Sequence, residues 1–233
     1  MKRIMVKEGF LPFDETDILK SIGMSPDHHF REPIRVQLEK TRDIAAPKGF
    51  FLECAVGDIA EKAVVIEGRT FISPTLSRLL RGTGTVYPYV ATCGRELEEY
   101  ASGLGDMVSK FALDAIMNFY QKQAAFAVEC AVLKRLPKGL FVSKATPGDV
   151  YDWDIRELRK LFELFGDAAA EAGVTLRENY LMTPLKTSAG LYCGVEDNAS
   201  ECRHCPREGC LDRKEAFDGR VYWGSRFIYR QAN

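Results

Sequence analysis

The stretch DMVSKFALDAIMNFYQKQAAFAVECAVLKRL, residues 106–136, is the longest helical pattern in this sequence of 233 residues. Its apolar residues recur at helical spacing, so the stretch predicts a central helix. Asp114 stands alone as an acid in the apolar part, either on a wet face or hydrogen-bonded to a neighbouring segment. We expect one broad buried face to include Phe111, Ala115, Ile116, Phe119, Phe126 and Cys130.

The segments before this helix mix helix and strand patterns. Residues 14–23 combine an Asp start with a Gly stop, and Pro74 stands in the first turn of another short helix. Residues 84–94 are β-branched and aromatic, and Pro88 predicts an edge or bulge position within that strand. The remaining patterns predict helices at 33–45 and 95–105 and paired strands at 49–56 and 62–68.

The segments after the long helix continue this mixture. Pro147 and Gly148 predict a turn within residues 144–154. An amphipathic helix is expected over 155–173, and strands over 174–179, 180–194 and 220–230. Strands and helices follow no strict β-α-β rhythm. The sequence therefore predicts an α+β fold with a mainly antiparallel sheet.

Composition limits the classes of function. Hydrophobic residues make up 46% and charged residues 28%, as in ordinary globular proteins, and the formal net charge is −1. No global field favours nucleic acid or an acidic membrane surface, so we expect neither as a partner. No signal-peptide pattern and no spanning apolar run is visible, which predicts a cytoplasmic protein.

Four of the seven cysteines lie in one short segment near the C-terminus, residues 193–210. They are Cys193, Cys202, Cys205 and Cys210, spaced Cys-x8-Cys-x2-Cys-x4-Cys. An odd cysteine count in a reducing compartment argues against a disulfide framework. Thiolates at i and i+3 can chelate one metal ion, so the segment predicts a metal site. The spacing matches no common ferredoxin pattern, and zinc held by four Cys, or with His204 in place of one, stays possible.

Other polar positions give weaker signals. Backbone N–H groups after Thr146 could bind an anion, although a plain turn explains the same residues. Lys186, Thr187 and Ser188 interrupt an apolar strand and face either a ligand or solvent. His28 and His29 are adjacent, so they do not converge on one metal. Neither a catalytic triad nor a phosphate-binding loop is evident.

The C-terminal half resembles the activation domain of cobalamin-dependent methionine synthase. The resemblance is carried by KFALDAI at 110–116, KATPGDVYDWDIRELRKLFELFG at 144–166 and GVTLRENYLMTPLKTSAGLY at 173–192. It implies a single α+β domain over residues 1–233, with a twisted, mainly antiparallel sheet and flanking helices. Such a domain binds S-adenosylmethionine and docks over a cobalamin domain. There an electron donor protein reduces cob(II)alamin, and the methyl group of S-adenosylmethionine then traps cob(I)alamin. The implied partner is a corrinoid methyltransferase that carries the cobalamin.

The same resemblance implies a ligand groove, with some residues changed. The family's turn reads Arg-x-x-x-Gly-Tyr-Pro, whereas here Lys144, Gly148 and Asp149 stand at the Arg, Gly and Tyr, and Asn118 stands at a ligand-binding Glu. Lysine cannot form the two-pronged arginine–carboxylate contact, which predicts weaker S-adenosylmethionine binding. The residues expected to line the groove are Lys144, Pro147, Gly148, Lys186, Ser188, Gly190 and Tyr192.

The cysteine segment has no counterpart in that family, which takes its electrons from a flavoprotein. The redox role implied by the resemblance favours an iron–sulfur cluster that delivers the electron locally. A zinc ion is the alternative. In that case the chain would be a zinc-stabilised, non-enzymatic docking module that holds the corrinoid protein in its base-off state and carries no electron.

Overall fold

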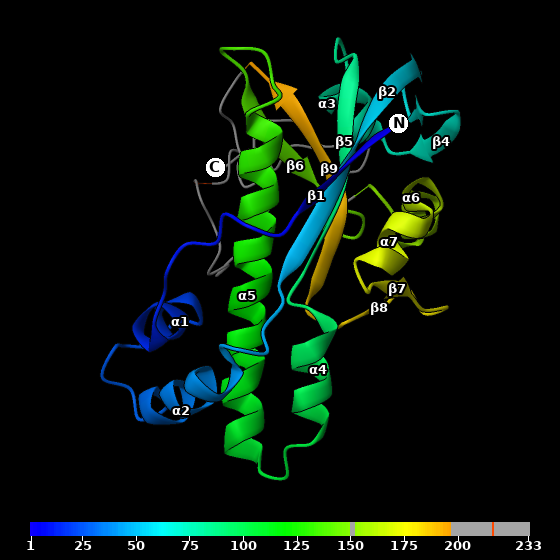
Figure 1. Ribbon diagram of the computed structural model, residues 1–233. Helices are drawn as coiled ribbons and strands as arrows, with labels where there is room; N and C mark the ends of the chain where they lie inside the picture. The colour runs from blue at the N-terminus through cyan, green and yellow to red at the C-terminus, as the bar shows by residue number, and fades with distance from the viewer. Residues whose placement is uncertain (150–151, 197–215, 217–233) are drawn as a thin grey trace, which may run out of the picture.

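The computed structural model describes residues 1–149, 152–196 and 216 (Figure 1). The strands are β1 (Lys2–Val6), β2 (Lys48–Ile59), β3 (Ala63–Ile66), β4 (Arg69–Ile72), β5 (Thr85–Thr92), β6 (Phe141–Ala145), β7 (Thr175–Leu176), β8 (Met182–Thr183) and β9 (Thr187–Val195). The helices are α1 (Glu15–Ser21), α2 (Arg31–Thr41), α3 (Pro74–Leu79), α4 (Arg95–Ser102), α5 (Met107–Leu133), α6 (Leu158–Phe165) and α7 (Asp167–Glu171), with a 3-10 turn at Ile155–Glu157.

The described strands form a sheet in the order β4-β3-β2-β5-β9-β6, with β1 paired to β2, and a separate β7–β8 pair. Every pairing is antiparallel, and β2 changes register between Val56 and Ile59. The predicted class, α+β with a mainly antiparallel sheet and flanking helices, is confirmed. Pro88 lies in the interior strand β5, opposite Leu191 of β9, so the expected edge position is wrong.

Helix α5 packs on one face of the sheet, and α6 and α7 lie on the other (Figure 1). Asp106 caps α5 by accepting a hydrogen bond from Ser109 N at 2.7 Å. Gly49 allows the close approach of α5, because a Cβ there would lie 2.5 Å from Val128 Cγ2.

Three hydrophobic clusters form the core. One lies between the sheet and α6–α7, one between the sheet and the C-terminal half of α5, and one joins α1, α2 and α4 to the N-terminal half of α5. Ala115 and Ile116 are buried as expected. Phe111 and Phe126 are 41% and 46% exposed, so the single broad buried face was predicted wrongly. The helix packs differently in its two halves.

Two C-terminal elements differ from the prediction. Gly166, at φ 51°, separates α6 from α7 within the expected helix 155–173. The expected strands at 174–194 shrink to the short β7 and β8 and to β9, which begins at Thr187 after Pro184. The expected strand 220–230 lies outside the described residues. Within the described part of the chain, no helix has the length and apolarity needed to cross a membrane.

Candidate functional site

The groove residues predicted on β9 converge on the sheet face that carries α5. Side chains alternate between the faces of a strand, so Lys186, Ser188, Gly190 and Tyr192 point to one side. Lys144 of β6 pairs with Tyr192 and therefore shares this face. Antiparallel pairing thus brings together a cation, a hydroxyl, a bare backbone position and an aromatic ring. The resemblance implies a ligand groove at these residues, so we call this region, with the facing side of α5, the β9 groove.

Helix α5 supplies the wall of the β9 groove. Asp114 Oδ2 accepts a hydrogen bond from Lys186 Nζ at 2.9 Å, which resolves the role of the lone acid. Gln121 Nε2 donates to Ser188 Oγ at 2.7 Å. Asp114, Asn118 and Gln121 recur at i, i+4 and i+7, so they lie on one side of the helix. Gln121 was not predicted from the sequence, although its helical spacing from Asp114 is a signal that points to it.

Gly190 is the tightest point on the groove floor. A Cβ at this position would collide with Ala145 O and would lie 3.1 Å from Thr146 Oγ1. The obstacle is mainly backbone, which cannot move aside as a flexible side chain can. Thr146 Oγ1 is itself buried without a hydrogen-bond partner among the described residues. Glycine is therefore required where β6 leaves the sheet beside β9.

Two tyrosines lie beside Gly190. Tyr89 of β5 pairs with Gly190, and its ring stacks on Tyr192 with centroids 4.2 Å apart. Tyr192 donates a hydrogen bond to Ala125 O of α5 at 3.4 Å. Both rings are buried, and Tyr89 Oη has no partner within the described structure. The stack closes the inner end of the groove between the sheet and α5.

The turn predicted at Pro147 and Gly148 follows β6. Gly148, at φ 87°, donates its N–H to Trp153 O at 2.8 Å, and a Cβ there would lie 2.9 Å from Ile155 Cδ1. Pro147 is buried and Gly148 is exposed. The positive φ and the crowding explain the glycine without a ligand.

Two aspartates tie this turn to its surroundings. Asp152 accepts hydrogen bonds from Ser73 Oγ at 2.6 Å and Thr75 Oγ1 at 2.9 Å. Asp154 accepts from Arg156 N at 2.8 Å and from the Arg156 guanidinium, and these hydrogen bonds lower the pKa of Asp154 to about 2. A carboxylate therefore already occupies the helix start, which favours the plain turn over an anion site.

Of the four predicted metal ligands, Cys193 alone lies within the described residues. Its side chain is 1% exposed and packs in the cluster beneath α6. Burial raises its thiol pKa from 9.0 to about 12. Cys202, Cys205 and Cys210 lie outside the described residues. Among the residues that the structure does describe, no cluster of three or more His, Cys, Asp or Glu could hold a metal.

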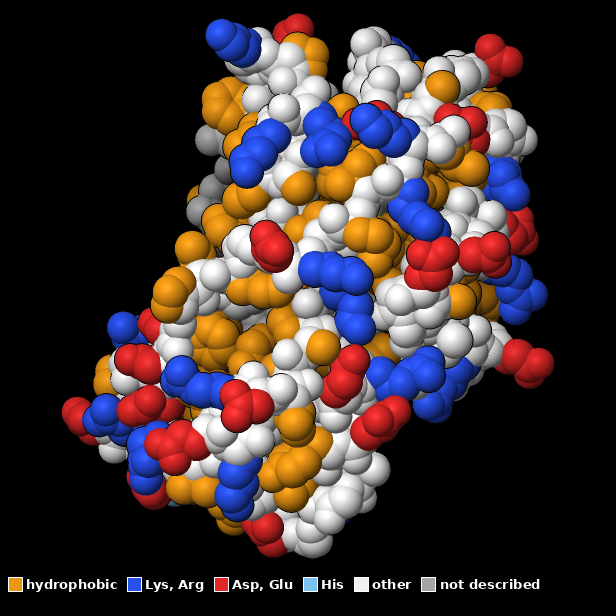
Figure 2. All heavy atoms as spheres, viewed as in Figure 1, with side chains coloured by type: hydrophobic (Ala, Val, Ile, Leu, Met, Phe, Trp, Pro, Cys, Tyr) orange, Lys and Arg blue, Asp and Glu red, His pale blue; other side chains and the backbone are white. Residues whose placement is uncertain are grey.

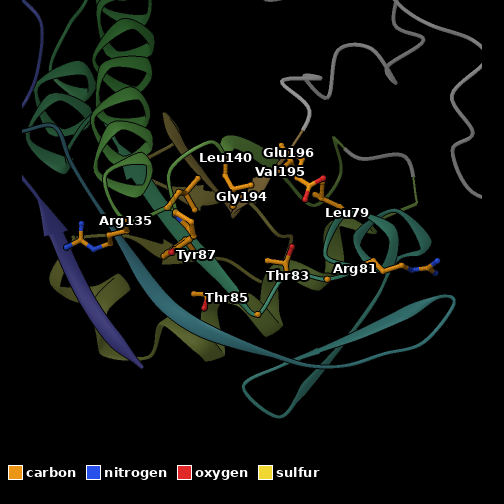
Figure 3. Close-up of a pocket in the computed structure, with 14 residues that line it drawn as sticks. Leu79, Arg81, Thr83, Thr85, Tyr87, Arg135, Leu140, Gly194, Val195 and Glu196 are labelled. Atoms are coloured by element: carbon orange, nitrogen blue, oxygen red, sulfur yellow. The ribbon is translucent and has the colours of Figure 1, made fainter.

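A pocket opens at the other end of β9, where the described chain reaches Glu196 (Figure 3). It encloses about 690 Å³ and was not anticipated from the sequence. The guanidinium groups of Arg81 and Arg135 point away from it on opposite sides (Figure 3). Its lining residues are Leu79, Arg81, Gly82, Thr83, Gly84, Thr85, Tyr87, Arg135, Leu136, Pro137, Leu140, Gly194, Val195 and Glu196.

Charge does not gather by sign on the face seen in Figure 2. Basic and acidic side chains alternate over its described part, with hydrophobic side chains exposed between them (Figure 2). Exposed hydrophobic residues on α5 include Phe126 and Leu133. The β9 groove therefore lies beside a helix with a partly apolar outer surface.

Comparison with known proteins places the fold. The structure matches a crystal structure of the MetH reactivation domain bound to AdoHcy, with a TM-score of 0.63. The match covers 85% of this chain and 80% of that one, at 14% sequence identity, so the likeness is one of fold. No family model and no curated protein sequence matches the chain. The expected activation-domain architecture is thereby confirmed.

Proposed function

We propose that this chain reactivates a cobalamin-dependent methyltransferase by docking against its corrinoid. The fold match over most of both chains carries the proposal, because that neighbour is the reactivation domain of MetH. An electron donor protein would supply one electron to convert Co(II) to Co(I). The methyl carbon of S-adenosylmethionine would then bond to cobalt. Its bond to sulfur breaks, sulfur keeps the electron pair, and S-adenosylhomocysteine leaves.

The β9 groove is the proposed site for the S-adenosyl ligand. The neighbour was crystallised with AdoHcy, and five of the seven residues predicted for the ligand lie on the face toward α5. The other two, Pro147 and Gly148, lie in the turn after β6. Lys144 can contact a ligand carboxylate as a point charge, and Asn118 is half-buried on the facing helix. Because neither side chain reproduces a charged two-pronged contact, we propose weak binding.

A metal site at Cys202, Cys205 and Cys210 is the second part of the proposal. The buried position of Cys193 argues against this residue as the fourth ligand. An iron–sulfur cluster held there would supply a one-electron carrier, whereas zinc would supply structure alone. Iron and zinc analysis of anaerobically purified protein distinguishes them. Cys205→Ser should lower the bound metal, and Cys193→Ala should leave it unchanged.

A docking module without its own ligand chemistry is the alternative. The observation that favours it is that polar side chains of the β9 groove bond to one another. Lys186 is bonded to Asp114, and Ser188 to Gln121. A groove whose polar groups satisfy one another can serve as a rigid surface for the corrinoid protein, which would remain the partner in both versions.

The deciding experiment is reactivation of a cob(II)alamin methyltransferase that lacks its own reactivation domain. Chemical reductant and S-adenosylmethionine are supplied, and methylcobalamin is followed by its visible spectrum. We expect methylcobalamin only when this chain and S-adenosylmethionine are both present. Activation without S-adenosylmethionine would favour the docking module. No effect of the chain under any condition would overturn both versions.

A further inference from the structure

The floor of the pocket at the end of β9 lies on the sheet face that carries α5. Tyr87 of β5 pairs with Tyr192 of β9, and both rings belong to the cluster beneath α5. Two residues further along the two strands stand Thr85 and Gly194, both in the pocket lining. Side chains alternate between the faces of a strand, so Thr85, Tyr87 and the bare position Gly194 share this face. The floor therefore combines two hydroxyl groups with a stretch of uncovered backbone.

The wall over this floor is aliphatic. A Cβ on Gly194 would lie 2.9 Å from Leu140 Cδ1 and 3.2 Å from Leu136 Cδ2, so the two leucines face the bare strand. At about 690 Å³ the pocket falls within the range of small-molecule sites, roughly 300 to 1,000 Å³. A flat apolar ring fits between the leucine methyl groups and the backbone of Gly194. The wall therefore favours a ligand with an apolar body.

The polar part of the lining consists of hydroxyl groups and one carboxylate. Thr83, Thr85 and Tyr87 supply the hydroxyl groups, and Glu196 is the single acid among the lining residues. Its side chain belongs to an exposed residue at the mouth, where water and ligand can both reach it. Hydroxyl and carboxylate oxygens all accept hydrogen bonds, and the carboxylate adds a negative charge. This part of the lining suits a ligand group that donates hydrogen bonds and carries positive charge.

The positive charges of the lining do not compete for this role. Figure 3 shows the guanidinium groups of Arg81 and Arg135 pointing away from the pocket. Arg135 is held outside, because its Nε lies 3.0 Å from Glu53 Oε1 and its guanidinium lies over the Phe51 ring. Within the described part of the chain, Glu196 takes part in no ion pair. Its carboxylate is therefore available to a ligand.

We propose that this pocket binds an organic monocation, a flat apolar ring that carries one ammonium group. The ring lies against Gly194 beneath Leu136 and Leu140, and the ammonium group contacts the Glu196 carboxylate and a hydroxyl group of the floor. Charge complementarity selects the cation, because an anion would meet the carboxylate and a neutral ligand would gain nothing from it. The site is separate from the β9 groove, and the proposal does not depend on the proposed reactivation activity.

Three probes with the same indole ring and different charges test the proposal. They are tryptamine, which is a cation at pH 7, tryptophol, which is neutral, and indole-3-acetate, which is an anion. Ligand-observed NMR titrations with the full chain measure each affinity. We expect tryptamine to bind several-fold more tightly than tryptophol, and indole-3-acetate to bind most weakly. Added salt should reduce the advantage of tryptamine, because Glu196 is exposed and salt screens its charge.

Substitution of the acid tests where the ammonium group lies. Glu196→Gln should abolish the preference for tryptamine over tryptophol and leave the affinity for tryptophol unchanged. Glu178→Gln is the matched control, since it removes the same charge from an exposed residue outside the lining. This control should keep the preference of the wild type.

Filling the pocket tests where the ring lies. Gly194→Leu should weaken the binding of tryptamine and tryptophol by a similar, large factor, because the leucine occupies the space of the ring. Gly105→Leu is the control, since a Cβ there meets nothing within 4 Å, and it should change neither affinity. Circular dichroism checks that both variants fold. If Gly194→Leu does not fold, Leu140→Phe fills the same space from a half-buried position.

Four outcomes would overturn the proposal. Binding of indole-3-acetate as tight as that of tryptamine would contradict the selection of a cation. A preference for tryptamine that survives Glu196→Gln would place the ammonium group elsewhere. Affinities that survive the filling of the pocket would place the ring outside it. No binding of any of the three probes would show that the pocket takes no such ring.

Discussion

The two ends of β9 differ in how much room they leave. Around Gly190 the strand is covered by Ala145 and Thr146, and the neighbouring Ser188 is bonded to α5. Around Gly194 the neighbours are leucine methyl groups beside a pocket of about 690 Å³. A glycine next to backbone cannot be replaced cheaply, whereas one next to flexible side-chain ends can. Strand β9 is therefore tightly packed around Gly190 and borders open space around Gly194.

Valine substitutions at the two glycines test this difference with the largest expected effect. Gly190→Val should lower the free energy of unfolding by about 3 kcal/mol, because its side chain must displace backbone. Gly194→Val should cost about 1 kcal/mol, since Leu136 and Leu140 can give way. Urea unfolding of both proteins measures the difference. Equal losses would show that the two ends are equally crowded.

Ligand binding at the closed end provides the second test. Lys144→Arg should tighten S-adenosylhomocysteine binding about tenfold, because arginine can contact a carboxylate with two N–H groups. Calorimetry measures the affinity, and the exposed Lys62→Arg serves as the control. A Lys144→Arg protein that binds no more tightly than wild type would remove Lys144 from the ligand site.

Cys193 lies between the two ends and offers a pH test. Its pKa is raised from 9.0 to about 12, so between these values the unfolded chain loses the proton while the folded chain keeps it. Stability must therefore fall as pH rises above about 9. Cys193→Ala should lessen the loss between pH 8 and pH 10 by about 1 kcal/mol. An unchanged loss in urea unfolding at the two pH values would indicate an accessible thiol.

The smallest expected effects concern the contacts that join β9 to α5. A double-mutant cycle on Ser188 and Gln121 should give a coupling of about 1 kcal/mol, as for a half-buried hydrogen bond. The same cycle on Lys186 and Asp114 should give about 0.3 kcal/mol, because Asp114 is 58% exposed and water screens the pair. The reverse order would mean that the ion pair, rather than the hydrogen bond, holds the groove together.

Local signals in the sequence predicted much of this fold. Asp14 caps α1 and Pro74 stands in the first turn of α3, as their residue types indicated. The position of Pro88 was predicted wrongly because strands distant in sequence decide whether β5 is an edge or an interior strand. Phe111 and Phe126 were misplaced for a related reason. Helix α5 is apolar on several sides, and its spacing alone does not show which side packs.

The groove was predicted less completely than the fold. Ser188 and Lys186 were equally compatible with solvent and with a ligand, and only the packing of α5 about 70 residues earlier in the chain decides where they lie. The pocket depends on three separate segments, so no short pattern could reveal it. The burial of Cys193 was also not predictable from neighbouring residues, because it results from the packing of α6 over the sheet.

Helix α5 contributes to two hydrophobic clusters, with Leu113 and Ile116 in one and Ala124 and Val128 in the other. Because one helix belongs to both clusters, a displacement of α5 in one cluster also shifts its contacts in the other. Among the described residues, the cluster around α1, α2 and α4 includes no residue of a strand, so we expect it to open first. Backbone amides in the N-terminal half of α5 should then exchange faster than those in its C-terminal half, which packs on the strands. A docking partner that binds the N-terminal half of α5 would therefore change the rigidity of the β9 groove without contacting it.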